Sequence, residues 1–189
     1  MVQPKDNLTP AMRQFHHFKA KHPDCILFFR MGDFYEMFFD DAKTCSKVLG
    51  LTLTSRGKNG PDPVPLAGVP YHAVDGYLKK MLQAGFRVAV CEQVEDPKTA
   101  KGVVKRDVVR IVTPGTLTDE MLLEDKKDNF LCAIHLDAKG FAVVSWVDLS
   151  TGHFFVQRVP ERDLLDELQR LTPAECLLAD RRGDRKSVV

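Results

Sequence analysis

The chain has 189 residues, 44% of them hydrophobic and 28% charged, and its formal net charge is +1. This length allows one large or two small hydrophobic cores, and the composition is ordinary for a globular protein. The five cysteines contain no C-x-x-C pair and no apolar run approaches about 18 residues, which argues against a disulfide framework, a zinc site and a membrane span, so we expect a cytoplasmic protein.

The two halves of the chain differ in charge. Residues 1–119 contain 17 Lys and Arg against 13 Asp and Glu, whereas residues 120–189 contain 10 against 13. A mildly basic N-terminal half suits an anionic partner such as nucleic acid, although an excess of this size is weak support by itself.

The first predicted elements are a helix and a strand. Thr9 is a favourable N-cap, Pro10 suits the first helical position, and Pro23 ends the helix. Residues 25–29 are continuously apolar and predict a strand in the centre of a sheet. Gly32 then permits a tight turn.

The segment after this turn predicts a second helix, capped by Asp33. Its buried stripe follows steps of three and four residues, namely Tyr35, Phe38, Ala42, Cys45 and Leu49. Phe34 precedes the stripe in the first turn, where its side chain can point outward, and Glu36 follows closely. The same residues also allow a capping box between Asp33 and Glu36, with Phe34 packed on Phe38 as a peripheral core residue.

The rest of the first half alternates strands, loops and one more helix. We expect a strand at residues 51–54, a loop at 55–65, a helix at 73–84 and strands at 86–91 and 108–112. Cations gather in two segments: Arg56 and Lys58 in the loop, and Lys98, Lys101, Lys105, Arg106 and Arg110 in residues 98–110. Both groups suit phosphate contacts, but loop charges are also simply solvated, and lysines on edge strands also prevent aggregation.

The second half begins with a charged segment, residues 117–129, that we interpret as a domain boundary. Beyond it, three strands at 130–135, 141–148 and 153–157 are separated by hairpin signals. A helix that begins at Pro160 and a strand at 175–179 complete a β-β-β-α-β order.

Residues 32–38 read Gly-Asp-Phe-Tyr-Glu-Met-Phe and resemble the mismatch-recognition motif of the MutS family of DNA mismatch repair proteins. Further stretches at residues 53–57, 65–72, 90–93 and 110–116 resemble the family in the same order. The resemblance implies an α/β chain: a mixed-sheet mismatch-recognition domain with helices at residues 1–116, a linker at 117–129, and a truncated connector domain at 130–189. The β-β-β-α-β order of the latter resembles an incomplete RNase H-like fold, whose half-built sheet would leave an unpaired edge.

The family motif implies a way of reading DNA. Phe34 would stack on a mispaired or unpaired base from the minor groove, Glu36 would hydrogen-bond that base, and the duplex would kink there. The flanking and backbone contacts that we expect are Asp33, Arg56, Lys58, Leu66, Tyr71, His72, Lys105, Arg106 and Arg110. For Tyr71 and His72, packing at the entry to the following helix is an equal alternative.

The sequence contains no phosphate-binding Gly-x-x-x-x-Gly-Lys-Ser/Thr loop. We therefore expect this chain to have no enzymatic activity and no cofactor. The resemblance implies that ATP and magnesium binding, homodimerisation and contacts with downstream repair proteins belong to the full-length family member, which would be cytoplasmic and associated with the nucleoid. The partner of this piece would be mismatched double-stranded DNA.

Two other functions are compatible with the sequence. A metal-dependent RNase H-like nuclease could use Asp137 or Asp148, Glu167 and Asp180 as ligands of two metal ions. Acids are common at strand ends and helix surfaces, however, and the connector domain that this half resembles is not catalytic. A protein-binding module with Phe34 as its anchor is the second alternative, and a pull-down insensitive to added DNA would favour it.

Overall fold

The computed structural model describes residues 8–57, 63–117, 128–179 and, for the backbone, 185–188. The chain divides into two compact units, Met1–Val112 and Thr113–Val189, and each is described by itself. The linker predicted at residues 117–129 lies mostly outside the described residues, so its exact bounds stay a prediction.

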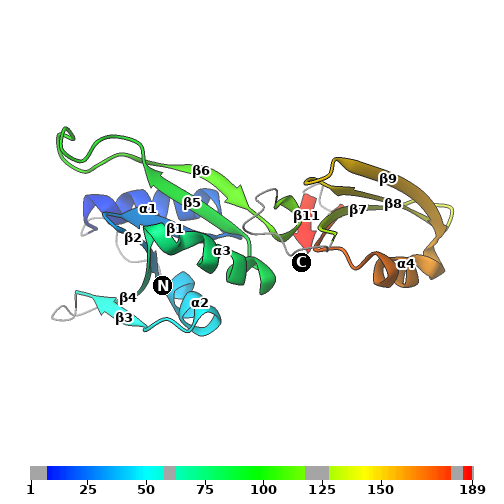
Figure 1. Cartoon of the computed structure of the whole chain (residues 1–189), viewed down its shortest axis with the longest axis horizontal. Helices are drawn as coiled ribbons and strands as arrows, with labels where there is room; N and C mark the ends of the chain where they lie inside the picture. The colour runs from blue at the N-terminus through cyan, green and yellow to red at the C-terminus, as the bar shows by residue number, and fades with distance from the viewer. Residues whose placement is uncertain (1–7, 58–62, 118–127, 180–184, 189) are drawn as a thin grey trace. The chain divides into compact units, whose positions relative to one another are not determined.

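In the described part of the first unit, six strands form one mixed sheet in the order β3-β4-β2-β1-β5-β6. Strands β1 and β5 run parallel, and the other neighbouring pairs are antiparallel. The elements are α1 (Pro10–Lys21), β1 (Ile26–Met31), β2 (Phe34–Phe38), α2 (Phe39–Leu49), β3 (Thr54–Arg56), β4 (Val64–Pro70), α3 (Val74–Gln83), β5 (Val88–Gln93) and β6 (Arg106–Val112) (Figure 1). The central position predicted for the apolar strand β1 is confirmed.

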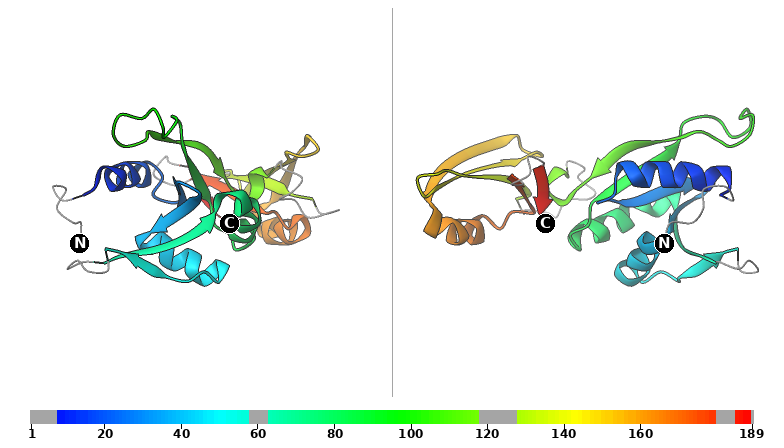
Figure 2. Two further views of the ribbon diagram at one scale, coloured as in Figure 1. Left: turned by 60° about the vertical axis from the view of Figure 1, so that its left-hand side comes forward. Right: turned by 180° about the vertical axis from the view of Figure 1, so that it is seen from behind.

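Helices cover both faces of this sheet. The face that carries α1 has a core in which Phe15 packs edge-to-face against Phe29 and Phe38. Because side chains alternate along a strand, Phe28 and Met37 point to the opposite face, where α2 and α3 lie. Figure 1 shows α3 in front of the sheet, and the reverse view in Figure 2 shows α1 in front.

The helix predicted to begin at Asp33 is wrong in its first part. Residues 34–38 are strand β2, which pairs with β1 on one side and β4 on the other. Gly32 has a φ of 61° in the two-residue hairpin turn between β1 and β2, and α2 begins only at Phe39. Asp33 therefore caps no helix, and the capping box with Glu36 does not form. Pairing on both sides outweighs the helical spacing that the segment shares with α2.

The second unit confirms the predicted β-β-β-α-β order. Its elements are β7 (Phe130–Leu136), β8 (Phe141–Asp148), β9 (His153–Pro160), α4 (Leu164–Leu171), β10 (Glu175–Ala179) and β11 (Arg185–Val188), and the strand order is β11-β10-β7-β8-β9. Helix α4 packs against one face, over a core that includes Ile134, Val144 and Trp146. A short 3₁₀ helix, Pro114–Thr116, belongs to this unit, because the Gly115 N–H donates to the buried carboxylate of Glu175 at 3.1 Å.

The cysteines have the structural character that the sequence predicts. All five are free thiols; Cys25, Cys45, Cys91 and Cys132 are buried and Cys176 is half-buried. None of the helices in the described residues has the length and apolarity of a membrane span.

Candidate nucleic-acid interface

Phe34 and Glu36 extend from the same face of β2, because strand residues two apart point the same way. Phe34 begins the strand, directly after the hairpin turn, and 48% of its surface is exposed. Phe38, on the same face, is 1% exposed and packs under α1. One face of one strand thus passes from a solvent-exposed aromatic ring, through a carboxylate, to the core.

Neighbouring strand β4 leaves room between these two side chains. Gly68 pairs with Glu36, and Leu66 pairs with Phe38. A Cβ atom at Gly68 would lie 3.9 Å from Cγ of Glu36 and 4.0 Å from Cδ1 of Phe34. Leu66 is half-buried and packs against the core beneath α1, so the structure places it beyond Phe38 rather than beside Phe34.

Glu36 lies between two guanidinium groups. Its Oε2 atom is 3.1 Å from a terminal nitrogen of Arg56 on β3, and Arg106 on β6 adds a second positive charge nearby. Burial raises the pKa of Glu36 above its ordinary 4.5, while the charges of Arg56 and Arg106 act in the opposite direction. The site therefore holds a carboxylate that is costly to ionise and is balanced by two cations.

The two cations differ in freedom. Arg106 donates through Nε to the Arg30 carbonyl at 2.7 Å and through a terminal nitrogen to the Val104 carbonyl at 2.9 Å, and its guanidinium lies 4.9 Å from the ring centre of Phe29. Arg56 is 48% exposed and bonds Glu36 from an edge strand. Arg106 is fixed in place, whereas Arg56 can exchange Glu36 for another anion.

The opposite face of the hairpin carries a second cluster. Arg30 is the strand partner of Tyr35, and its guanidinium lies 3.9 Å from the ring centre of Tyr71. The Tyr35 hydroxyl donates to Glu92, and burial with this bond raises the pKa of Tyr35 to about 12. The Tyr71 N–H donates to the Asp33 carbonyl at 2.9 Å. Tyr71 therefore contacts the hairpin turn from the side away from Phe34, in a 3₁₀ helix (Tyr71–Ala73) that it shares with exposed His72.

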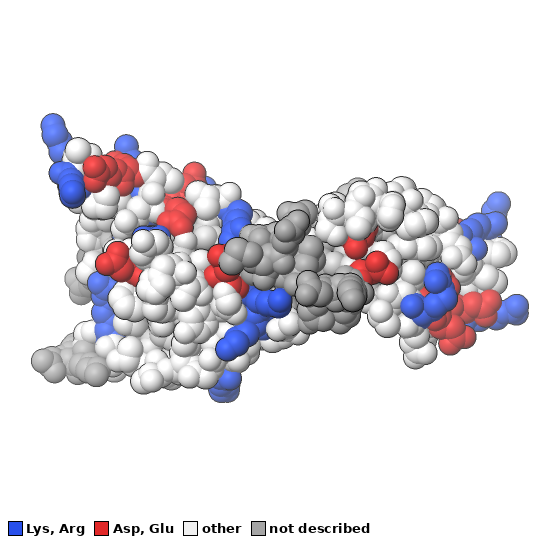
Figure 3. Space-filling model, viewed as in Figure 1, with Lys and Arg blue, Asp and Glu red and all other residues white. Residues whose placement is uncertain are grey.

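Of the remaining predicted cations, Arg110 and Lys105 lie in the part of the chain that the structure describes, and both are at β6. Arg110 follows a bulge in β6 and pairs with Asp75 of α3, at 3.6 Å. Lys105 is exposed and directly precedes β6, and Lys58 lies outside the described residues. On the face in Figure 3, basic side chains are scattered among acidic ones.

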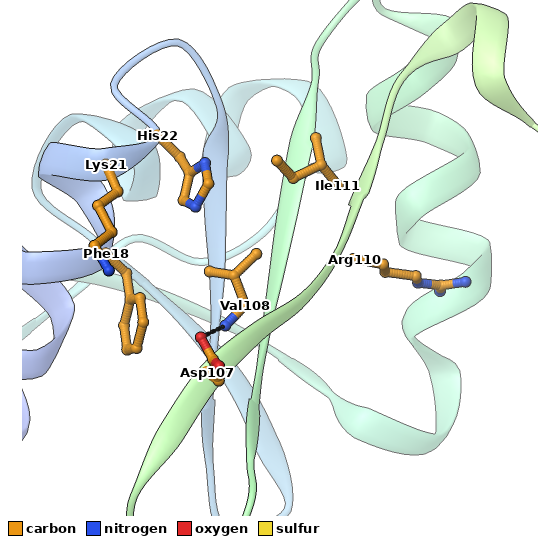
Figure 4. A pocket seen from close by; sticks show the side chains of 7 residues that line it. All are labelled: Phe18, Lys21, His22, Asp107, Val108, Arg110 and Ile111. Atoms are coloured by element: carbon orange, nitrogen blue, oxygen red, sulfur yellow. Dashed lines mark hydrogen bonds between the residues drawn. The ribbon is translucent and has the colours of Figure 1, made fainter.

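A surface hollow of about 350 Å³ lies between the end of α1 and β6. Its lining residues are Phe18, Lys21, His22, Asp107, Val108, Arg110 and Ile111 (Figure 4). Figure 4 shows the Arg110 side chain directed away from the others, in keeping with its ion pair to Asp75. The hollow is separate from Phe34 and Glu36 and includes neither.

The three acids of the nuclease alternative that the structure describes have structural partners instead of one another. Asp137 accepts the backbone N–H groups of its turn and pairs with Arg158 at 3.0 Å. Asp148 is buried and accepts from Ser150 and Asn129. Glu167 pairs with Arg170 one turn along α4, and Asp180 lies outside the described residues. Within those residues no group of three or more His, Cys, Asp or Glu could hold a metal ion.

Sequence reasoning missed Arg30, Gly68 and Glu92. All three lie within or beside the motif stretches, which is a usable signal, but they are brought together with the hairpin only by pairing between strands that are distant in the sequence.

Comparison with protein families matches both structural units. Residues 9–121 match the family model described as MutS domain I, and residues 129–187 match the one described as MutS domain II. The first match contains the hairpin with Phe34 and Glu36, and the second contains strands β7 to β10 with α4.

Proposed function

Since the chain belongs to the MutS family and contains its domains I and II, which serve mismatch recognition in DNA repair, we propose that Phe34 is the wedge that probes the duplex and that Glu36 bonds the probed base. The partner is then double-stranded DNA with a mispaired or unpaired base.

The energetics of a wedge explain how one side chain serves many mismatches. Opening a base step costs a few kcal/mol, and bending the site costs roughly 1–6 kcal/mol. Stacking a base on an aromatic ring returns about 1–3 kcal/mol. A matched duplex resists the wedge, whereas a mismatch has already lost part of its stacking and pairing. Phe34 therefore reads deformability and needs no base-specific contact.

Glu36 complements the wedge in two ways. Its carboxylate repels phosphates and so weakens binding to matched DNA, for which no bond to a base compensates. At a mismatch it hydrogen-bonds the displaced base, as an acceptor when ionised or as a donor when protonated. Its raised pKa makes the donor form more accessible than for a solvated glutamate.

The observation that supports the proposal most is the pairing of an exposed Phe34 with a half-buried Glu36 on one strand face. A large exposed aromatic beside a carboxylate of raised pKa has no role in the core. The experiment is a competition titration at low salt between two duplexes that differ by one mismatch. Equal affinity for the two duplexes contradicts the proposal.

We further propose that this chain is a DNA-binding part without catalysis of its own. Homodimerisation, ATP and magnesium binding, contacts with downstream repair proteins and a cytoplasmic, nucleoid-associated location are then properties of the full-length family member. DNA binding by the chain alone should be weak, because few cations contribute to it.

A further inference from the structure

The guanidinium group of Arg30 supports the β1–β2 hairpin from the face opposite to Phe34, which directly follows the turn. We infer that Arg30 is a positioning residue for Phe34: it braces the β1–β2 hairpin from the opposite face of the sheet and so fixes the direction of the wedge. This inference rests on the proposed function of Phe34 and names a residue that positions that site.

Arg30 contacts the hairpin at several points. Its Nε donates to the carbonyl of Gly32 inside the turn. Its guanidinium carbon lies 3.9 Å from the ring centre of Tyr71 and 5.6 Å from that of Tyr35, and a terminal nitrogen is 3.6 Å from Glu92 of β5. One planar cation thus connects the turn to three other elements of the unit.

These contacts fix the backbone on both sides of Phe34. Before it, the carbonyls of the two turn residues are held, Gly32 by Arg30 and Asp33 by the Tyr71 N–H. After it, Tyr35 is 4% exposed and its hydroxyl donates to Glu92. Phe34 itself points to the other face and makes none of these bonds. Phe34 is also strand-paired with Met31 and Pro70, whereas the two turn residues before it are not, so bracing of the turn from behind helps to set the approach of the exposed ring.

Only arginine suits this position. The guanidinium is flat, so it stacks on Tyr71 while its edge donates to the Gly32 carbonyl and faces Glu92. A lysine at the same place keeps the charge beside Glu92 but has neither the flat face nor the Nε donor. A group that is already fixed in its binding geometry loses less conformational entropy when it binds. Here this smaller entropy cost favours mismatched sites, because only they admit the wedge.

The test uses the whole chain with three variants and one control. Arg30→Lys removes the stacking and the bond to Gly32; Tyr71→Leu removes the stacking partner, and Tyr71→Phe preserves it. Arg87→Lys is the control, since Arg87 pairs with Asp24 beyond the start of β1, at the end of the strand away from the hairpin. Two quantities are measured: amide hydrogen exchange of residues 32–35, and the ratio of affinities for mismatched and matched duplexes.

For Arg30→Lys and Tyr71→Leu we expect faster exchange in the hairpin and a ratio lowered about two- to fivefold, and in Arg30→Lys the matched-duplex affinity should be unchanged. Arg87→Lys should keep wild-type values for both quantities, and Tyr71→Phe, which keeps the aromatic face under Arg30, should keep the wild-type exchange of the hairpin. Wild-type exchange and ratio in Arg30→Lys overturn the inference. An equal loss of affinity for both duplexes also overturns it, because Arg30 is then a DNA contact. If Arg30→Lys fails to fold, the two Tyr71 variants decide.

Failure of the proposed function gives a different result. If the wild type binds mismatched and matched duplexes with equal affinity, the proposed wedge function of Phe34 is contradicted. The exchange measurement still shows whether Arg30 braces the hairpin.

Discussion

Phe34 and Glu36 flank the same glycine of the neighbouring strand, Gly68, whose missing Cβ would lie within 4.0 Å of both side chains. The proposed wedge and the proposed base-bonding group thus share one open position beside β2, at Gly68 of β4. In the helix that the sequence predicts for this segment, residues two apart point in different directions. The strand is what makes the two side chains neighbours.

Phe34→Ala should abolish the preference for mismatched DNA and change the melting temperature little. Phe34 is 48% exposed, so its removal opens no cavity, and we expect a loss of stability within about 1 kcal/mol. Phe38→Ala is the matched control, because the same change at a 1% exposed ring should cost roughly 3–5 kcal/mol. Thermal melts and competition titrations measure both effects. A Phe34→Ala protein that melts as early as Phe38→Ala and keeps its mismatch preference makes Phe34 a core residue.

Gly68→Ala should keep the fold and reduce discrimination. The new methyl group meets its nearest atom, the Tyr35 carbonyl oxygen, at 3.5 Å, which is ordinary contact, and an alanine in a strand is about 0.5–1 kcal/mol more favourable than glycine. The methyl group nevertheless fills the space between Phe34 and Glu36. The measurements are a thermal melt and the affinity ratio for the two duplexes; unchanged discrimination shows that this space is not used.

Gly115→Ala is the contrasting control for that substitution. There the added Cβ would lie 2.8 Å from Cβ of Glu175, so the second unit should be destabilised. If Gly115→Ala has the melting temperature of the wild type, the distances of the added Cβ atoms do not predict the effect of either substitution.

Much of the architecture could be predicted from local signals, but the hairpin and its neighbour β4 (Val64–Pro70) could not, and β3 (Thr54–Arg56) begins where the predicted strand at 51–54 ends. The apolar run of β1 and the turn residues between β7, β8 and β9 identify their elements correctly. Residues 34–38 contain three aromatic residues and suit a strand, but Asp33 and the stripe of α2 favour a helix through the same segment. Pairing with β4, more than 25 residues away, decides the outcome.

The same limit applies to the candidate site. Phe34 and Glu36 were identified from their motif, and the structure leaves one exposed and the other half-buried. The role of Arg30 depends on Tyr71 and Glu92, which come from other elements, and Arg110 lies with Asp75 instead of with Phe34. Residue type indicates that a cation can bind phosphate, but only the tertiary structure shows which cations are already occupied.

Arg106 and Lys105 should differ as variants although they are adjacent cations. Lys105→Gln should leave the melt unchanged and lower the salt dependence of DNA binding by about one unit of the logarithmic slope. Arg106→Gln should cost about 1–3 kcal/mol of stability, because it removes the Nε donor to the Arg30 carbonyl and one of the two side-chain donors to the Val104 carbonyl, the other being Gln14. Thermal melts and salt titrations separate the two. Equal melts for both variants contradict the structural role of Arg106.

Glu36→Gln should bind matched DNA more tightly than the wild type and discriminate less. Removing a negative charge near phosphates is worth about 1 kcal/mol at low salt, or roughly fivefold in affinity, and the gain should shrink as salt is added. Arg56, released from its pair with Glu36, becomes available for phosphate and adds to the effect. Matched-duplex affinity that falls in Glu36→Gln shows that the carboxylate does not oppose binding.

The stability of Glu36→Gln gives an independent check through pH. Burial raises the pKa of Glu36 above 4.5 in the folded protein, against the charges of Arg56 and Arg106, so the folded state binds this proton more tightly than the unfolded state does. The stability linked to protonation is therefore complete below 4.5 and is lost as the pH rises through the folded-state pKa. At pH 7 the wild type should melt no higher than Glu36→Gln, and its relative stability should improve as the pH falls toward 4.5. The difference in melting temperature between the two proteins at each pH excludes the contribution of the other acids, because these titrate alike in both proteins. A wild type that instead loses stability relative to the variant on acidification makes the ion pair with Arg56 stronger than the burial of Glu36.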